Sequence, residues 1–263
     1  MTFAFTEQQM LRYARQIVLP EIGGTGQARL LRAKVLLIGA GGLGSPLLLY
    51  LAAAGVGTIG VVDRDRVELS NLHRQIAHPT ARIGATKTES AIEAARALNP
   101  EISVIAHQIE LGPDNAAALV EGYDLVADGS DNFATRDALH DACLNLGRTL
   151  ISAAIQGFEG QLSTFKAHLG PPHPCYRCLF PSEPPADLIP SCAEGGILGP
   201  AAGALGCLQA VEVVKELLGL GESLSGALLL YDALEPELRR IRIVRRPDCA
   251  VCGRFSPRAA EHA

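Results

Sequence analysis

The chain has 263 residues, enough for one large α/β domain with a sizeable core, and 48% of them are hydrophobic. Its formal net charge of −5 and its low aromatic content (5%, no Trp) argue against binding to nucleic acid or to an anionic membrane. The first seven residues contain no basic segment followed by an apolar run, so we expect no secretory signal and a cytoplasmic protein.

Two short helices are expected first. An amphipathic helix is predicted over residues 7–19 and ended by Pro20, with an apolar face formed by Met10, Tyr13, Ala14 and Ile17. Gly23-Gly24 predicts a turn, and a second helix is expected over residues 27–33.

The segment from Val35 to Val62 has no charged residue over 28 positions, which is longer than a membrane span requires. It contains seven glycines, however, and divides into a strand over 35–38, a helix over 46–54 and a strand over 58–62. The segment therefore predicts a βαβ unit rather than a membrane helix.

The alternation of strands and helices continues along the chain. Helices are expected over 86–98, 115–121, 135–146 and 198–218, and strands over 102–106, 123–127, 149–154, 161–167, 227–233 and 238–244. The strand over 123–127 is expected to end in an acidic turn, Asp128-Gly-Ser-Asp131. This pattern predicts a Rossmann-like α/β fold with a doubly wound, mainly parallel sheet and an antiparallel C-terminal extension.

A glycine-rich turn lies between the first strand and its helix. The glycines are Gly39, Gly41, Gly42 and Gly44, and Asp63 ends the next strand. Glycines let the backbone approach a phosphate at a helix N-terminus, and the carboxylate can accept hydrogen bonds from ribose hydroxyls. The turn by itself fits NAD, FAD, S-adenosylmethionine or ATP.

Further polar residues favour ATP among these ligands. Asn71 and Arg74 lie in the loop after the second strand, Lys87 begins a helix, and Asp131 follows a strand at the carboxyl edge of the sheet, where it can ligate Mg²⁺. Attack on an α-phosphate builds negative charge that such cations stabilise, whereas hydride transfer does not need them.

At these residues the sequence resembles the ThiF/MoeB/HesA group, relatives of ubiquitin-activating enzymes, from about Leu11 to Cys252. The shared motifs are Arg12-Tyr-Ala-Arg15-Gln, Gly39-Ala-Gly-Gly-Leu-Gly44, Asp63-x-Asp65, Ser70-Asn-Leu-His-Arg74-Gln, Gly84-Ala-Thr-Lys87, Ser130-Asp131-Asn132 and two Cys-x-x-Cys pairs. The resemblance implies adenylation of the C-terminal glycine of a small ubiquitin-like sulfur carrier, of the MoaD or ThiS kind, ending in Gly-Gly.

The resemblance also implies roles for individual residues. Asp63 would bind the ribose, Arg74 and Lys87 the phosphates, and Asp131 the Mg²⁺, with Asp65, Asn71 and Asn132 in the same nucleotide site. Arg15 would reach the nucleotide of a partner subunit, which implies a homodimer. We expect one domain over residues 1–253, with an N-terminal arm (1–33), a nucleotide-binding half (34–155) and a carrier-binding half (156–253), followed by a tail (254–263).

The paired cysteines predict a structural zinc site. Cys175 and Cys178 form one Cys-x-x-Cys pair, and Cys249 and Cys252 form the other. Two such pairs can supply four thiolates in a tetrahedron, with no position left open for catalysis, although redox dithiols are the alternative. His173, close by, is interpreted as a surface residue.

The other cysteines are interpreted separately. Cys192 precedes a long apolar helix, and a cysteine at a helix N-terminus can be an activated nucleophile. It matches a crossover-loop cysteine of the resembled family that takes part in acyl or persulfide chemistry in some branches only, so its covalent role stays open. Cys143 and Cys207 lie in apolar helical patterns and are expected in the core.

Several alternatives and open points remain. They are an NAD-dependent oxidoreductase, a non-catalytic zinc-stabilised scaffold, and a relative of the tRNA-modifying dehydratases. The chain ends eleven residues after Cys252, so we expect no rhodanese domain of the kind fused to some relatives and a separate protein as sulfur donor. The sequence leaves the pathway open between molybdopterin, thiamin and tRNA thiolation.

Overall fold

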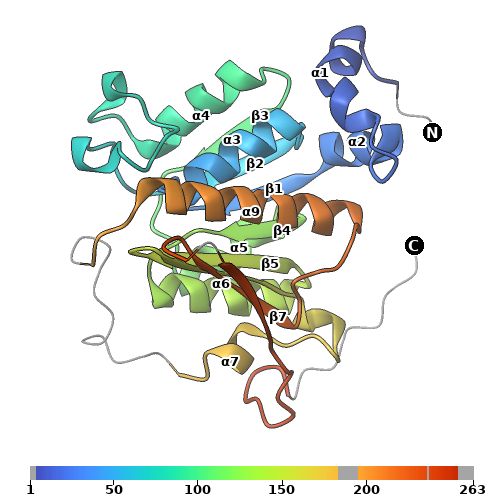
Figure 1. The fold of residues 1–263 in the computed structure, drawn as a ribbon, viewed down its shortest axis with the longest axis vertical. Coiled ribbons are helices and arrows are strands. Elements are labelled where there is room, and N and C mark those ends of the chain that lie inside the picture. Colours follow the sequence, from blue (N-terminus) through green and yellow to red (C-terminus); the bar gives the residue numbers. More distant parts are fainter. Residues whose placement is uncertain (1–3, 183–194, 236, 254–263) are drawn as a thin grey trace.

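The computed structural model describes residues 4–182, 195–235 and 237–253. Its central feature is one eight-stranded sheet in the order β3-β2-β1-β4-β5-β6-β7-β8 (Figure 1). The strands are β1 (Lys34–Ile38), β2 (Thr58–Val62), β3 (Ser103–His107), β4 (Leu125–Asp128), β5 (Thr149–Gln156), β6 (Glu159–Phe165), β7 (Ala227–Asp232) and β8 (Glu237–Arg242).

The sheet divides into a parallel and an antiparallel part. Strands β3, β2, β1, β4 and β5 pair in parallel, with Ile38 opposite Val62 and Asp128. Strands β6, β7 and β8 then pair antiparallel with their predecessors. The predicted mainly parallel sheet with an antiparallel C-terminal extension is therefore confirmed.

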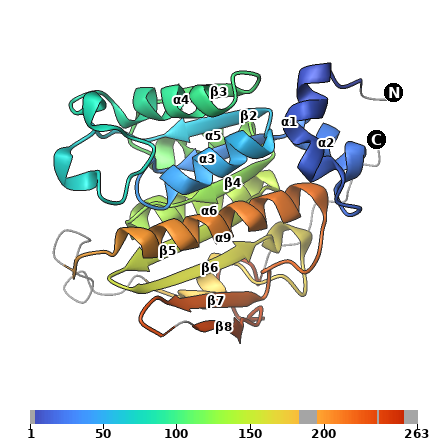
Figure 2. The ribbon, with the colours of Figure 1, turned by 45° about the horizontal axis from the view of Figure 1, so that its top comes forward.

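Helices cover both faces of the parallel part. On one face lie α3 (Gly44–Ala54), α4 (Lys87–Leu98) and α9 (Gly199–Leu218), and on the other α5 (Pro113–Glu121) and α6 (Phe133–Leu146) (Figure 2). The shorter elements are α1 (Glu7–Ile17), α2 (Gly23–Arg32), α7 (Tyr176–Leu179), and the 3-10 turns η1 (Leu69–Asn71), η2 (Thr80–Arg82) and η3 (Ala167–Leu169). Each face has its own apolar core, as a doubly covered parallel sheet requires.

Helix α3 explains why the uncharged segment 35–62 is so apolar. The helix packs between α4 and α9 and against the sheet, so Leu47, Leu48 and Leu51 are completely buried. Its C-terminus is closed by Gly55, which has a φ of +83°. Among the described residues no helix is both long and apolar enough to span a membrane.

Three local predictions at the sequence level were wrong. Gly23 and Gly24 do not form a turn before a helix, because α2 already begins at Gly23. Met10 is 47% exposed, so only Tyr13 of the predicted apolar face of α1 is fully buried. Asp128 does not begin a turn: it is the last residue of β4 and completely buried.

Candidate functional site

The glycine-rich turn links β1 to α3 and packs tightly on itself. A Cβ atom added to Gly44 would lie 1.8 Å from the carbonyl oxygen of Gly39, a distance that no side chain tolerates. A Cβ on Gly39 would lie 3.2 Å from the carbonyl oxygen of Gly129, in the loop that follows β4. The turn is thus in direct contact with the segment that leads to Asp131.

Asp63 supports the turn from the end of β2. Its Oδ2 accepts a hydrogen bond from the backbone N–H of Ala40 at 2.8 Å, and its Oδ1 accepts one from the N–H of Asp65 at 2.8 Å. A carboxylate oxygen has a second lone pair, so ribose hydroxyls can still bind the same side chain. The carboxylate therefore joins the glycine turn to the loop that follows β2.

Arg74 lies directly on the glycine turn. A Cβ on Gly42 would meet Cγ and Cδ of Arg74 at 3.5 Å. The guanidinium donates from Nη2 to Oδ1 of Asn71 at 2.9 Å and from Nη1 to the carbonyl of Ser70 at 3.3 Å. Asn71 therefore orients the arginine, and the structure brings both predicted residues to the turn.

Lys87 is buried at the start of α4. Its side chain is 7% exposed, and its Nζ lies 2.8 Å from Oδ2 of Asp65, whose side chain is 55% exposed. Thr86 caps the helix by accepting a hydrogen bond from the N–H of Glu89. Through Asp65, Lys87 is connected to Asp63 and thereby to the glycine turn.

Asp131 and Asn132 follow β4 at the same edge of the sheet. Asp131 is exposed and makes no hydrogen bond or ion pair with the residues that the structure describes. An unpaired carboxylate suits Mg²⁺, which in proteins binds one or two carboxylates and completes its shell with phosphates and water. Asn132 caps α6, and its Oδ1 accepts from the N–H of Thr135 at 2.8 Å.

Two buried charged residues next to the Asp131 loop, Asp128 and Arg136, were not among the predicted site residues. Asp128 accepts hydrogen bonds from Ser152 Oγ at 2.8 Å and from the N–H of Ser130 at 2.9 Å. Arg136 donates from Nη2 to the carbonyl of Ser130 at 2.6 Å, and its Nε lies 3.9 Å from Asp128 Oδ2. Both ends of Ser130 are therefore fixed. The sequence signals were Asp128 at the end of the predicted strand and an arginine one helical turn beyond Asn132.

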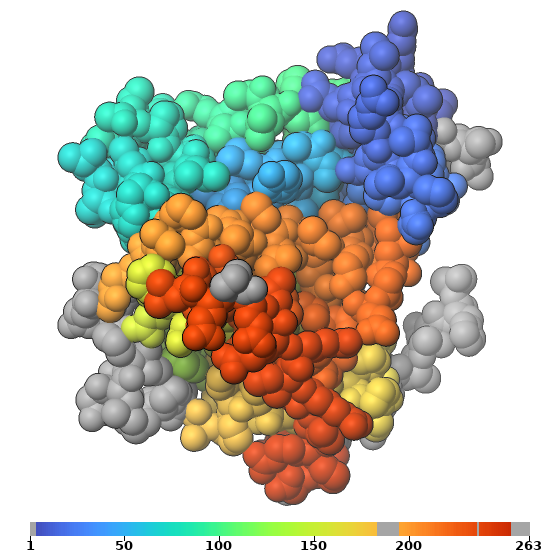
Figure 3. Space-filling model, viewed as in Figure 1, coloured from blue at the N-terminus to red at the C-terminus, as the bar shows by residue number. Residues whose placement is uncertain are grey.

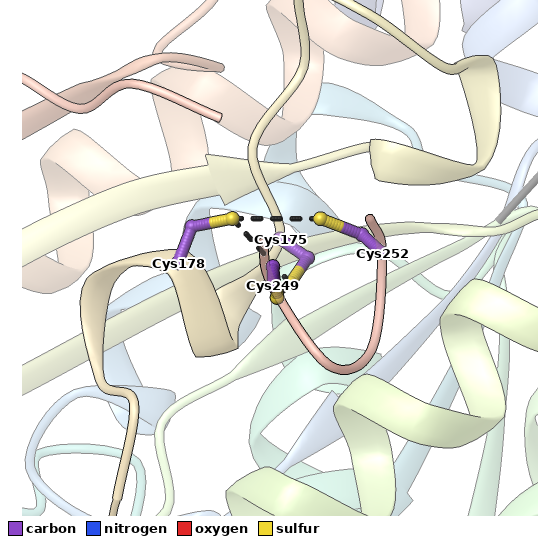
Figure 4. A group of neighbouring side chains, drawn as sticks. All are labelled: Cys175, Cys178, Cys249 and Cys252. Carbon is purple, nitrogen blue, oxygen red and sulfur yellow. Dashed lines mark hydrogen bonds between the residues drawn. The ribbon is translucent and has the colours of Figure 1, made fainter. Parts of the chain in front are cut away.

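The four paired cysteines meet in space, as the sequence predicts (Figure 4). The sulfur–sulfur distances are 3.8 Å for Cys175–Cys178, 3.7 Å for Cys175–Cys249 and 3.4 Å for Cys178–Cys252. Tetrahedral zinc with bonds of about 2.3 Å separates its sulfur ligands by roughly 3.8 Å. Burial raises the pKa of the Cys175 thiol, so its thiolate needs a cation beside it. The donor set fits a divalent metal ion.

The structure also tests the predicted positions of His173, Cys143 and Cys207. His173 is half-buried, with its Nδ1 2.9 Å from Ser225 Oγ, rather than on the open surface. Cys143 is buried in the core, as predicted, and this burial raises the pKa of its thiol. Cys207 is only partly buried, on the outer side of α9.

A family model described as the ThiF family matches residues 13–251. The chain belongs to the ThiF family. It is 49% identical over 251 residues to a Thermus thermophilus protein named sulfur carrier protein adenylyltransferase, with 95% of this chain and 93% of that protein covered. It is 52% identical to adenylyltransferase and sulfurtransferase MOCS3 of Sus scrofa, over 95% of this chain and 54% of that protein.

The chain spans about half the length of the MOCS3 relatives that it matches. Among solved structures, Escherichia coli MccB superposes with a TM-score of 0.83 at 22% identity, covering 98% of this chain and 76% of that one. MccB with ATP superposes with a TM-score of 0.82 at 24% identity, covering 92% and 74%. These likenesses establish the fold of the ThiF-family chain.

One described residue implicated by the resemblance lies apart from this site. Arg15 is on α1, which packs at the far end of α3 through Gln16, whose Nε2 donates to the carbonyl of Ala54 at 3.1 Å. The eleven residues of α3 separate that end from the glycine turn by about 16 Å. The chain's own fold therefore does not bring Arg15 to the turn. Cys192 lies outside the described residues.

Proposed function

We propose that this chain is an ATP-dependent adenylyltransferase that activates the C-terminal glycine carboxylate of a small ubiquitin-like sulfur carrier. The observation that carries the proposal is the glycine turn with the Arg74 side chain lying on Gly42. Relatives that share about half of its residues are named adenylyltransferases, and one is named for its sulfur carrier.

The charges around the turn suit attack on an α-phosphate. As the carrier carboxylate adds to the phosphorus and pyrophosphate leaves, negative charge grows on the nonbridging and departing oxygens. Arg74 and the buried Lys87 provide positive charge there, and Mg²⁺ held by Asp131 would add to it. Because Lys87 is already held by Asp65 at 2.8 Å, little reorganisation is needed when the nucleotide binds.

An NAD-dependent oxidoreductase explains less of the same geometry. The glycine turn and Asp63 serve a dinucleotide equally well. Hydride transfer, however, assigns no role to a lysine buried at 7% exposure beside the turn or to the unpaired Asp131 carboxylate. Adenylation accounts for both side chains.

A homodimer is part of the proposal. The outer side of α9 carries no charged residue before the buried Glu212, and Val211 on this side is 57% exposed. Tyr50, on the neighbouring α3, is 59% exposed. Figure 3 shows α9 (orange) lying on this face of the molecule beside α3 (blue). A continuous apolar helix face on a protein surface is typical of an interface, and a second copy would supply the missing Arg15.

The remaining partners follow from the same relatives. The Thermus relative, of which this chain covers 93%, is named for adenylyl transfer alone, whereas the longer MOCS3 relatives are also named for sulfur transfer. Adenylation of a carrier does not itself supply sulfur, so the proposal includes a sulfur donor protein, with Cys192 as a candidate acceptor. The four gathered thiols support a zinc ion and a reducing, cytoplasmic location.

The deciding experiment is ATP–pyrophosphate exchange with candidate carriers that end in Gly-Gly, followed by the intact mass of the carrier. Lys87→Ala and Asp131→Ala should each lower exchange by about 100-fold or more. Lys34→Ala is the control, because Lys34 begins β1, at the end of the strand away from the glycine turn. If no carrier stimulates exchange while the wild-type protein binds ATP, adenylation of a protein carboxylate is refuted.

A further inference from the structure

His78 is a buried histidine behind the glycine turn. It has no part in the function proposed above. Its side chain is 3% exposed, and it lies in the loop between η1 and η2. The Nε2 atom is 2.8 Å from the carbonyl oxygen of Ala40, and the Nδ1 atom is 2.9 Å from Ser90 Oγ. The ring therefore bridges the glycine turn and helix α4.

The two partners fix the tautomer of the ring. A carbonyl oxygen can only accept, so Nε2 carries the proton and donates to Ala40. In the neutral ring Nδ1 then accepts from the hydroxyl of Ser90. Burial lowers the pKa of His78, which keeps the ring in this neutral form near pH 7.

The bond to Ala40 sets the direction of the next backbone amide. In a trans peptide the C=O and the following N–H point in opposite directions, so the carbonyl of Ala40 turned toward His78 turns the N–H of Gly41 away from it. That N–H makes no hydrogen bond to any residue that the structure describes. The preceding N–H, of Ala40, is held by Asp63. Two successive peptide groups of the turn are thus oriented by side chains from outside it.

The bond to Ser90 connects this arrangement to the lysine. Ser90 is 1% exposed and lies three residues after Lys87, on the first turn of α4. A displacement of α4 relative to the turn would therefore break the bridge through His78. The His78 imidazole therefore fixes the position of the Gly41 amide relative to the Lys87 ammonium.

We propose that His78 is a positioning residue, whose Nε2–H turns the Gly41 N–H outward as a donor for a nucleotide phosphate and whose bond to Ser90 sets the distance to Lys87. This inference rests on the proposed function for the identity of the ligand. It assigns the histidine no contact with the nucleotide itself.

The two halves of the bridge can be separated by substitution. The amide nitrogen of Gln reaches the position of Nε2, whereas that of Asn reaches only the position of Nδ1. His78→Gln therefore keeps the donor to Ala40, and His78→Asn loses it. Both variants lose one buried hydrogen bond, so a purely structural role predicts equal effects. The inference predicts that the Kd for Mg·ATP rises about five- to tenfold in His78→Asn and stays within about twofold in His78→Gln.

The matched controls are His107→Asn and His107→Gln. His107 also bonds through Nε2, to the hydroxyl of Tyr123 at 2.8 Å, but its side chain lies against α5, away from the turn. Isothermal titration calorimetry with Mg·ATP and no carrier, together with the urea midpoint, is measured for all four variants. Neither His107 variant should change the Kd.

Each outcome decides the inference. If the two variants have similar urea midpoints and His78→Asn binds Mg·ATP more weakly than His78→Gln, the inference is supported. If the two His78 variants have equal Kd values, it is overturned. If His78→Asn does not fold, Ser90→Ala is the deciding variant, because in it the His78 ring loses its hydrogen bond to Ser90. A Kd for Mg·ATP that is raised twofold or more supports the inference, and an unchanged Kd overturns it. If the wild-type protein binds no ATP, the proposed function is refuted, and with it the positioning role of His78. If the two His78 variants bind Mg·ATP with equal Kd values, only the positioning role is refuted.

Discussion

The buried pair of Asp128 and Arg136 should be highly sensitive to the loss of one charge. Asp128 has no exposed surface and Arg136 has 8%. Replacing Asp128 with Asn keeps the volume and the hydrogen bond from Ser130, but it leaves the guanidinium without its counter-charge. We expect Asp128→Asn to destabilise the fold and to loosen the loop before Asp131.

The magnitude follows from the geometry. At 3.9 Å and an effective dielectric constant of about 20, the charge attraction is about 4 kcal/mol. Part of this is offset because a buried carboxylate no longer has to be desolvated. Weakening of the two hydrogen bonds to Asp128, from Ser152 and Ser130, adds about 1 kcal/mol. The net loss should be about 3 kcal/mol, a large part of the stability of a typical domain.

Equilibrium unfolding in urea at one fixed protein concentration measures this loss. Asp124→Asn is the control, because Asp124 is exposed and accepts one hydrogen bond, from the N–H of Lys34, so it should cost less than about 1 kcal/mol. Adding Arg136→Met to Asp128→Asn should recover about 2 kcal/mol relative to the sum of the single changes. A loss below about 1 kcal/mol in Asp128→Asn, or strict additivity, would refute the reasoning.

Two further predictions concern the metal and the pH dependence. Cys249→Ser should abolish binding of the proposed zinc ion, measured by elemental analysis, and lower the melting temperature, because three thiolates no longer enclose the ion; full zinc occupancy would contradict this. Burial lowers the pKa of His140 to about 4 in the folded chain. Below about pH 6.5 the unfolded chain therefore binds a proton at His140 that the folded chain does not bind. The free energy of unfolding is unaffected by His140 above that pH and falls by up to about 3 kcal/mol toward pH 4. His140→Phe should flatten this slope in urea unfolding, and an unchanged slope would exclude His140 as its origin.

The sequence allowed prediction of those features that depend on local pattern. The uncharged segment 35–62 predicts a βαβ unit because only short elements fit between its glycines, and the two Cys-x-x-Cys pairs predict a metal site because the ligand type and spacing are specific. The strand–helix alternation places Arg74, Lys87 and Asp131 at one sheet edge. All three follow from short-range rules about periodicity and ligands.

The support around the site could not be predicted in the same way. His78 binds a carbonyl 38 residues away, and Ser152 reaches Asp128 across 24 residues. A histidine in a loop and an aspartate after a strand carry no mark of such partners, because burial and hydrogen bonding depend on elements that meet only in the folded chain. Asn132 had a visible local role, since Asn before a helix is a strong cap. The nucleotide contact that the resemblance implies for Asn132 stays a prediction.

The glycines of the turn yield a last prediction, because the protein's own packing explains some of them and not others. Gly44 has no room for a Cβ, which would lie 1.8 Å from the carbonyl oxygen of Gly39. At Gly41 a Cβ would meet only Gln75 Nε2, at 3.7 Å, and φ is not positive there. No contact in the part of the chain that the structure describes therefore requires glycine at 41, whereas a phosphate approaching its free N–H would.

Gly41→Ala should accordingly fold with a stability within about 1 kcal/mol of the wild type but lose about 1–3 kcal/mol of affinity for Mg·ATP, roughly five- to 150-fold in Kd. Gly44→Ala should lose about 3 kcal/mol of stability, because the backbone must move to admit the methyl group. Urea unfolding and calorimetric titration of both variants separate the two effects. If Gly41→Ala binds Mg·ATP as tightly as the wild type, the phosphate does not lie against this amide, and both the role of the turn and the purpose assigned to His78 are wrong.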